Sequence, residues 1–290
     1  MGFFSNLLDS LRSSKHSGFA HRMPSRPDFP IGVFDSGIGG LTVARALMRH
    51  LPHESILYFG DTARVPYGVK SVDTIIQYAV QITDFLLERE VKLLIVACNT
   101  MAAVAAHAIR ARSPVPVLDV ITVGAQVAAQ STRNRRVGVI GTLATINSGA
   151  YNAAIHSHDP AISIHSQACP LFVPLVEEGW LDHPVTLLTA QEYLAPVLAQ
   201  RIDTLVLGCT HYPLLQPLLE GVAGHSVRII DSAAATAAQT DALLTQLGLR
   251  NPGSTSPEHQ FYVTDVPQRF QSVGERFLGK PLNNIQLVKW

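Results

Sequence analysis

Two stretches decide the fold: residues 93–100, LLIVACNT, and residues 204–211, TLVLGCTH. Each is an apolar run that ends in a cysteine, with a predicted helix beginning shortly afterwards. An apolar run without alternating polar residues is typical of a parallel strand that helices cover on both faces. The chain has only three cysteines, and Cys98 and Cys209 stand in matched settings 111 residues apart (209 − 98). This match indicates a repeated α/β unit.

Other landmarks repeat at nearly the same spacing. IGVFDSG (31–37) corresponds to VGVIGTL (137–143), and Asp119 corresponds to Asp231 at an offset of 112 (231 − 119). Chance is the alternative, because any α/β protein repeats an apolar strand followed by Gly or Asp. The shared order favours duplication.

Short β-branched runs alternate with helical stretches from residue 31 onward, which predicts parallel sheets covered by helices. The predicted strands span residues 31–35, 55–60, 93–97, 115–120, 136–141, 161–166, 203–208 and 226–231. Helices are predicted over 41–51 and over 71–90, the second with Ser71 as N-cap. We therefore expect an α/β protein of two similar, pseudo-symmetric lobes, each a mostly parallel sheet flanked by helices.

Composition excludes several classes of protein. Hydrophobic residues make up 47% of the 290 residues, while Lys plus Arg and Asp plus Glu both number 22. A net charge of zero lacks the basic field that nucleic-acid binding requires, so no nucleic-acid partner is expected. No apolar run reaches the ~18–20 residues that span a bilayer, so no integral membrane segment is expected. An odd, small number of cysteines suits a reducing compartment, and the predicted location is the cytoplasm.

The first 28 residues differ in character from the rest and form an N-terminal extension and linker. Phe4, Leu7, Leu8 and Leu11 have the spacing of a short amphipathic helix. This segment is predicted either to extend freely or pack on itself, or to contact a partner or a membrane surface.

The matched cysteines are the first candidates for chemistry. Each stands just before a predicted helix, whose partial positive charge favours a thiolate and can hold a carboxylate. Ligands of open α/β sheets bind beyond the carboxyl ends of the strands, so two facing lobes would present both thiols to one cleft. The alternative is a small apolar side chain that ends a buried strand. Cys169 lacks the helix context and is interpreted as structural.

Metal and dithiol sites are not indicated, because there is no closely spaced pair such as C-x₂-C. The turn after residue 35 has Gly37, Gly39 and Gly40, which is not the G-x-G-x-x-G of a dinucleotide site. It displays Asp35, which could orient a thiol or bind an ammonium group, and Ser36, which could donate to a carboxylate. An ordinary Asp-Ser-Gly turn is the alternative.

Other polar residues stand near these motifs. Tyr67 and Gly68 follow a strand and could contact a ligand through a hydroxyl and the backbone. His211 could be an acid/base partner of Cys209 or a helix cap. Glu177 and Glu178 are, from the sequence alone, more typical of a solvated surface pair. Backbone N–H groups and hydroxyls at Ser36, Asn99, Thr100 and Thr210 are candidate donors to substrate charge.

Two opposed thiols suit one reaction class especially well. A thiolate removes the proton from a carbon centre while a thiol delivers one to its opposite face, which inverts the centre. For an amino acid this would proceed without a pyridoxal cofactor, so the site must stabilise the carbanion with aimed donors and exclude water. Inversion of an amino acid is therefore the predicted reaction, with no cofactor and no metal.

Five motifs, in this order and spacing, closely resemble the cofactor-independent glutamate racemases. They are VFDSGIGGL (33–41), PYG (66–68), ACNT (97–100), FVPLVEEG (172–179) and GCTHYPLL (208–215). The resemblance covers nearly all of the chain after the extension. It implies two α/β lobes with the active site between them, and interconversion of L- and D-glutamate for bacterial peptidoglycan synthesis.

The resemblance also implies roles for single residues. Cys98 would handle the D-isomer with help from Asp35, and Cys209 the L-isomer with help from His211 and Glu177. The substrate-contacting positions it implies are Asp35, Ser36, Tyr67, Gly68, Asn99, Thr100, Thr210 and His211. The chain after about residue 231 would return to the first lobe, which gives residues 29–122 plus 232–290 for that lobe and 123–231 for the second.

Two alternatives to a glutamate racemase stay open. One is a racemase of aspartate or another amino acid, since the length of the pocket decides the substrate. The other is a two-lobed protein that binds an amino acid and regulates a partner, for which only the extension speaks. A homodimer is one assembly that the sequence leaves open.

Overall fold

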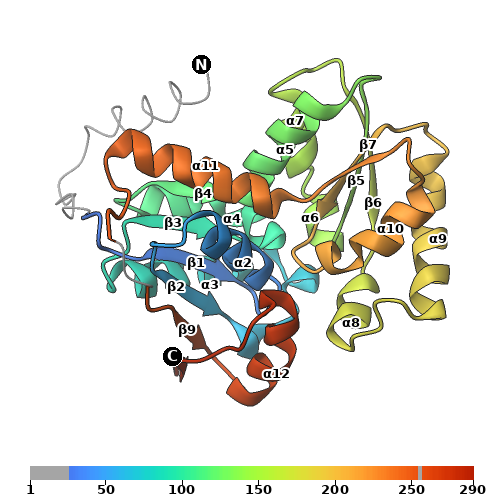
Figure 1. Ribbon diagram of the computed structural model, residues 1–290. Helices are drawn as coiled ribbons and strands as arrows, with labels where there is room; N and C mark the ends of the chain where they lie inside the picture. Colours follow the sequence, from blue (N-terminus) through green and yellow to red (C-terminus); the bar gives the residue numbers. More distant parts are fainter. Residues whose placement is uncertain (1–25, 254–256) are drawn as a thin grey trace.

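The computed structural model describes residues 26–253 and 257–290, in which two parallel sheets stand beside one another (Figure 1). The six-stranded sheet, in the order β10-β9-β2-β1-β3-β4, and its helices form what we call the first lobe. The four-stranded sheet, in the order β6-β5-β7-β8, and its helices form the second lobe. The predicted fold class is confirmed. The helix predicted within the first 25 residues lies outside the described residues.

The strands match the eight predictions closely and add two more. Those of the first lobe are β1 (Ile31–Asp35), β2 (Ile56–Gly60), β3 (Leu93–Val96), β4 (Val117–Asp119), β9 (Gln260–Val263) and β10 (Ile285–Leu287). Those of the second lobe are β5 (Arg136–Gly141), β6 (Ser163–Ala168), β7 (Thr204–Gly208) and β8 (Arg228–Ile230). The strands β9 and β10 were not predicted.

The α-helices are α2 (Leu41–His50), α3 (Val72–Leu87), α4 (Asn99–Arg112), α5 (Val120–Ser131), α6 (Leu143–Asn147), α7 (Ala150–His156), α8 (Phe172–Glu177), α9 (Pro184–Leu198), α10 (Gln216–Ala223), α11 (Ser232–Leu247) and α12 (Pro267–Leu278). Short 3₁₀ turns are η1 (Thr62–Arg64), η2 (Tyr67–Val69) and η3 (Tyr212–Leu215). The predicted N-cap of α3 is confirmed, since Ser71 Oγ accepts a hydrogen bond from the N–H of Thr74.

The sequence repeat corresponds to a repeat of topology. The strand order β2-β1-β3-β4 of the first lobe recurs as β6-β5-β7-β8 in the second. Gly32 lies in β1 and Gly138 in β5, where a Cβ would come within 3.0 Å of Leu94 and 2.6 Å of Val197 respectively. Both glycines therefore admit neighbouring side chains against the central strand. Cys98 and Cys209 follow the equivalent strands β3 and β7, at the carboxyl ends where ligands bind.

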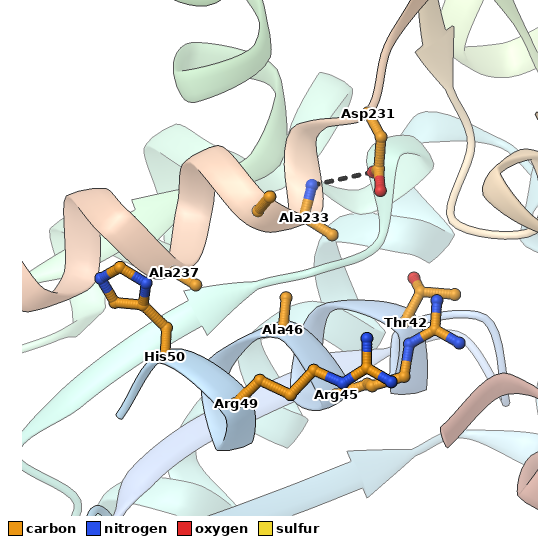
Figure 2. Close-up of a pocket in the computed structure, with 9 residues that line it drawn as sticks. Thr42, Arg45, Ala46, Arg49, His50, Asp231, Ala233 and Ala237 are labelled. Carbon is orange, nitrogen blue, oxygen red and sulfur yellow. Dashed lines mark hydrogen bonds between the residues drawn. The ribbon is translucent and has the colours of Figure 1, made fainter. Parts of the chain in front are cut away.

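Two helices carry the chain between the lobes. Asp119 caps α5 by accepting from the N–H of Thr122 at 2.8 Å, and Asp231 caps α11 by accepting from the N–H of Ala233 at 2.9 Å. Helix α11 then lies along α2 of the first lobe, and Figure 2 shows the seam between them, with Arg45 of α2 below the capping carboxylate. The boundary predicted at residues 122/123 falls inside α5, and the lobe boundaries stay a prediction.

Within the described ranges, 26–253 and 257–290, we find no helix with the length and apolar content needed to span a membrane.

Candidate active site

A cavity of about 460 Å³ opens between the lobes and is lined by both cysteines. Apolar side chains form part of its wall, including Val65 and Pro66 from the first lobe and Leu143 and Val173 from the second. The predicted site residues that line it are Ser36, Tyr67, Gly68, Cys98, Asn99, Thr100, Glu177, Cys209, Thr210 and His211. Residues far apart in the sequence thus meet at one concave site, as expected of a small-molecule pocket.

Cys98 begins helix α4 as its N-cap. Its sulfur accepts from the N–H of Met101 at 3.4 Å and lies 3.6 Å from Ser36 Oγ, and the residue is 4% exposed. Burial, together with the nearby charge of Asp35, raises the pKa of Cys98 to about 12, although those hydrogen bonds oppose the rise. The Met101 N–H at the helix terminus favours the thiolate, as expected, but its contribution is the smaller one. Desolvation outweighs the helix, so the group is a neutral thiol.

Asp35 lies at the end of β1, behind the glycine-rich turn. Its Oδ2 accepts from the N–H of Gly37 at 2.9 Å, while Oδ1 is buried without a hydrogen-bond partner among the described residues. Burial raises the pKa of Asp35, although the charge of His211 opposes this rise. Asp35 does not line the cavity, so it acts on Cys98 through its charge rather than by contact with the cavity.

Cys209, His211 and Glu177 form a chain of polar contacts, which we call the relay. The Cys209 sulfur lies 3.9 Å from Nδ1 of His211, whose Nε2 lies 3.1 Å from Oε1 of Glu177. Burial disfavours the imidazolium, yet the contacts with Cys209 and Glu177 raise the pKa of His211 to about 10. His211 therefore carries a positive charge at neutral pH. The helix predicted directly after Cys209 begins instead as a 3₁₀ turn at Tyr212, so the helix terminus lies farther from this thiol.

The two adjacent glutamates have different environments, although the sequence alone favoured a solvated pair. Glu177 is the last residue of α8 and faces His211, whereas Glu178 is exposed. Burial opposes ionisation of Glu177, but the hydrogen bond and charge of His211 lower its pKa. The pair His211–Glu177 is consequently an ion pair at neutral pH.

The remaining predicted contacts are buried residues that also line the cavity. The Tyr67 hydroxyl donates to Asp61, which leaves its ring and the adjacent backbone facing the cavity. Oδ1 of Asn99 accepts from the Tyr151 hydroxyl at 2.8 Å, so its amide nitrogen stays available to a ligand. The carbonyl of Thr210 accepts from the Thr42 hydroxyl at 3.2 Å, a contact that joins the lobes.

Two residues that sequence reasoning missed complete the site. Thr142 lines the cavity, and its hydroxyl lies 3.0 Å from that of Thr100 across the lobes. The sequence repeat held the signal, because Thr142 corresponds to Ser36 at the offset of 106 (142 − 36) that also relates Gly32 to Gly138. Gly39 approaches the second lobe so closely that a Cβ there would lie 2.2 Å from Thr210 Oγ1.

Over the part of the chain that the structure describes, no group of three or more His, Cys, Asp or Glu side chains is arranged to hold a metal ion. The polar groups at the cavity instead comprise thiols, hydroxyls, one imidazolium, one carboxylate and backbone amides. Such a set can bind the charged groups of a small zwitterion and move protons on both of its sides.

Comparisons with known proteins agree with this geometry. Residues 41–240 match the model of the family described as Asp/Glu/Hydantoin racemase. A glutamate racemase of Syntrophus aciditrophicus is 66% identical over 260 residues, which cover 90% of this chain and 96% of that protein. The structure of glutamate racemase from Francisella tularensis in complex with D-glutamate matches with a TM-score of 0.86 and 43% identity, covering 91% of this chain and 98% of that one.

A more distant likeness concerns the fold alone. The aspartate racemase of Picrophilus torridus matches with a TM-score of 0.52 and 19% identity, covering 76% of this chain and 94% of that one. The resemblance that the sequence motifs predicted is confirmed by these findings.

Proposed function

This chain belongs to the Asp/Glu/Hydantoin racemase family, and from that premise we propose that it interconverts L- and D-glutamate by proton transfer between two cysteines. It is a cofactor-independent amino-acid racemase. The observation that carries the mechanism is the single cavity lined by Cys98 and Cys209 from opposite lobes. Thiols on both sides of one ligand can remove and deliver a proton on opposite faces of its Cα.

The protonation states suggest how a turnover begins. Cys98 is a neutral thiol because of its burial, and a neutral thiol is the form that delivers a proton. Cys209 then acts as the base toward L-glutamate, and the proton arrives from Cys98 to give D-glutamate. For the reverse direction, the ammonium group of D-glutamate near Cys98 and Asp35 adds an opposite charge, which favours the Cys98 thiolate.

The other residues divide into donors and charge partners. The carboxylates of glutamate need hydrogen-bond donors, and the N–H groups of Asn99, Thr100 and Thr210 with the hydroxyl of Ser36 supply them. His211 and Glu177 assist Cys209, and Asp35 assists Cys98. Tyr67 and Gly68 contact the substrate from the wall of the cavity. The apolar wall excludes water, which strengthens every one of these interactions.

We propose glutamate rather than aspartate as the substrate because of the names and sequence identities of the relatives. Proteins named glutamate racemase match most of the chain at high identity, while the aspartate racemase of P. torridus matches at 19%. A protein that binds an amino acid without turning it over would need neither thiol, which argues against a purely regulatory role.

Three further properties are part of this proposal. D-Glutamate would supply peptidoglycan synthesis, and the location would be the cytoplasm, where the free thiols Cys98, Cys169 and Cys209 stay reduced. The apolar rim of the cavity, with Val69 and Leu143 exposed, suits a homodimer contact. Light scattering of the purified protein at several concentrations distinguishes monomer from dimer.

The decisive experiment follows each glutamate enantiomer in D₂O without pyridoxal phosphate. We expect optical rotation to decay to zero while the product enantiomer acquires deuterium at Cα. Retention of the Cα proton in the product would contradict exchange through two separate bases. The same assay with L- and D-aspartate tests specificity, and turnover of aspartate at the rate of glutamate would contradict the proposed substrate.

The two thiols are tested separately by Cys98→Ser and Cys209→Ser. Because a serine hydroxyl is a far weaker acid than a thiol, each change is expected to lower kcat/KM by at least ~10³-fold, within the range of general acid–base contributions. Cys169→Ser is the matched control, since Cys169 is buried outside the cavity. Near-normal racemisation by either of the first two variants would refute the assignment.

A further inference from the structure

Helix α12 lies outside every motif that identified the site, yet it contacts the residues behind Cys209. It belongs to the returning segment of the first lobe and faces α8 of the second lobe (Figure 1). Three of its side chains reach the Glu177–His211 pair: Arg269, Arg276 and Phe277.

Arg276 binds the backbone rather than a side chain. Its Nη1 donates to the carbonyl oxygens of Val176 and Glu177, each at 3.2 Å. These are the last carbonyls of α8. That of Val176 also accepts from the N–H of Gly179 at 3.0 Å, and a cation beside both carbonyls complements the negative end of the helix. Helix α8 has only six residues, so a contact at its end bears on the position of Glu177 directly.

Gly179 makes room for this contact. Its φ of +78° suits glycine, and a Cβ there would lie 2.9 Å from Nη1 of Arg276. The chain turns at Gly179 immediately after α8, and the lack of a side chain there lets the guanidinium of the other lobe approach the two carbonyls.

The two other α12 side chains contact the relay itself. Oε1 of Glu177 lies 3.1 Å from the imidazole, and Oε2 lies 3.5 Å from Nη2 of Arg269. The Phe277 ring meets the His211 ring edge-on, with centroids 5.1 Å apart at 81°. The Arg269 side chain is 63% exposed, so its ion pair contributes little. Arg276 is also exposed, but its Nη1 makes two hydrogen bonds to backbone carbonyls at the end of α8, so it bears more directly on the position of Glu177.

We propose that Arg276 is a positioning residue of the Cys209 half-reaction: it fixes the end of α8 so that Glu177 holds His211 against Cys209. The relay is then assembled only while α12 of one lobe touches α8 of the other, which couples lobe contact to chemistry on one face of the substrate. This inference rests on the proposed function and assigns a residue that touches neither substrate nor thiol.

The proposal has an asymmetric kinetic consequence. L- and D-glutamate have equal free energies, so the loss in kcat/KM must be the same in both directions. The isotope effects need not be the same. When the Cys209 step is slowed, removal of a Cα deuteron from L-glutamate limits the rate more, and removal from D-glutamate by Cys98 limits it less.

The test uses the variants Arg276→Ala and Arg276→Glu. Their rates of racemisation are measured with Cα-deuterated and with protiated glutamate, starting from each enantiomer. We expect kcat/KM to fall about tenfold in Arg276→Ala and further in Arg276→Glu. Both losses should be smaller than the ~10²-fold that a 1 Å misplacement of a reacting group can cost. The isotope effect from L-glutamate should rise and that from D-glutamate should fall toward unity. In NMR titrations, the pKa of His211 should fall from about 10, because Glu177 no longer holds the imidazolium.

Two controls separate position from general damage. Gln268→Ala changes an exposed residue of the same helix, and Arg133→Ala removes an exposed arginine whose side chain makes no hydrogen bond within the described ranges. Both should keep wild-type rates and isotope effects. Unchanged kcat/KM in Arg276→Ala, or a loss with equal isotope effects from both enantiomers, overturns the proposal. A wild-type protein that fails to racemise glutamate would instead overturn the proposed function.

Discussion

At the scale of single residues, the two halves of the site are held in different charge states. Cys98 is neutral because burial and the Asp35 charge oppose ionisation, whereas His211 is positive because its contacts with Glu177 and the Cys209 sulfur stabilise its proton. A neutral thiol on one side of the cavity and an imidazolium on the other give turnover a defined starting state. The cysteines were predictable from the repeat, but the protonation state of Cys98 was not, because burial is set by tertiary packing.

The charge of His211 makes stability depend on pH. Its pKa is about 10 in the folded protein and about 6.5 when unfolded, so the folded state binds more protons between these values. The stabilisation is complete below pH 6.5 and is lost as the pH rises toward 10. Thermal unfolding between about pH 6.5 and 8.5 should therefore show a melting temperature that falls with pH.

The variant His211→Gln is the comparison for this effect. It should remove most of the slope in that window, since the raised pKa of Cys98 acts at higher pH. A variant whose melting temperature declines as steeply as that of the wild type would show that His211 is not the titrating group.

At the scale of elements, the glycine-rich turn between β1 and α2 is explained by contact between lobes. A Cβ at Gly39 would lie 2.2 Å from Thr210 Oγ1 and 2.6 Å from His211 Nδ1. The glycines thus admit the turn after β7, rather than the phosphates of a dinucleotide. This is a second place where the first lobe sets the position of His211.

Gly39→Ala should consequently displace Thr210 and His211 without disturbing either sheet. We expect kcat/KM to fall by ~10²-fold, the cost of a misplacement of about 1 Å, with circular dichroism unchanged. Gly221→Ala in α10 is the matched control, because a Cβ at Gly221 meets nothing within 4 Å. Racemisation by Gly39→Ala at the control's rate would refute the close contact.

The elements also show where sequence reading succeeds and fails. The central strands β1, β2, β3, β5 and β7 were predictable because they are apolar runs buried on both faces of their sheets. The strands β9 and β10 were missed; β10 is a three-residue edge strand with two exposed residues, so its sequence carries little apolar signal. The role of α12 was likewise not predictable, since Arg276 acts on carbonyl groups 100 residues away that no motif marks.

At the scale of the whole molecule, a buried ion pair ties distant segments at the base of the first lobe. Lys92 Nζ lies 2.5 Å from Oε2 of Glu54 and donates to the carbonyls of Pro27 and Leu249. Oε1 of Glu54 accepts from the N–H of Asn251 at 2.8 Å. The start of the described chain, the first sheet and the segment after α11 therefore share one cluster.

Lys92→Met should destabilise the protein by about 3–5 kcal/mol, because it leaves the Glu54 carboxylate buried without its cation. Denaturant unfolding measures this change. Adding Glu54→Gln should restore part of the loss, since the amide oxygen still accepts from Asn251. Lys289→Met, at an exposed lysine, is the control, and equal stability of the two single variants would contradict the role of the cluster.

The return of the chain to the first sheet has a consequence for biosynthesis. Strand β9 pairs with β2 through Tyr58 and Phe261, some 200 residues apart, while the whole second sheet is encoded between them. On the ribosome, the second sheet can form before β2 has its outer neighbour. Until residue 263 emerges, a fully apolar strand presents an open edge that invites pairing with other nascent chains. Shielding by chaperones would matter most in this interval.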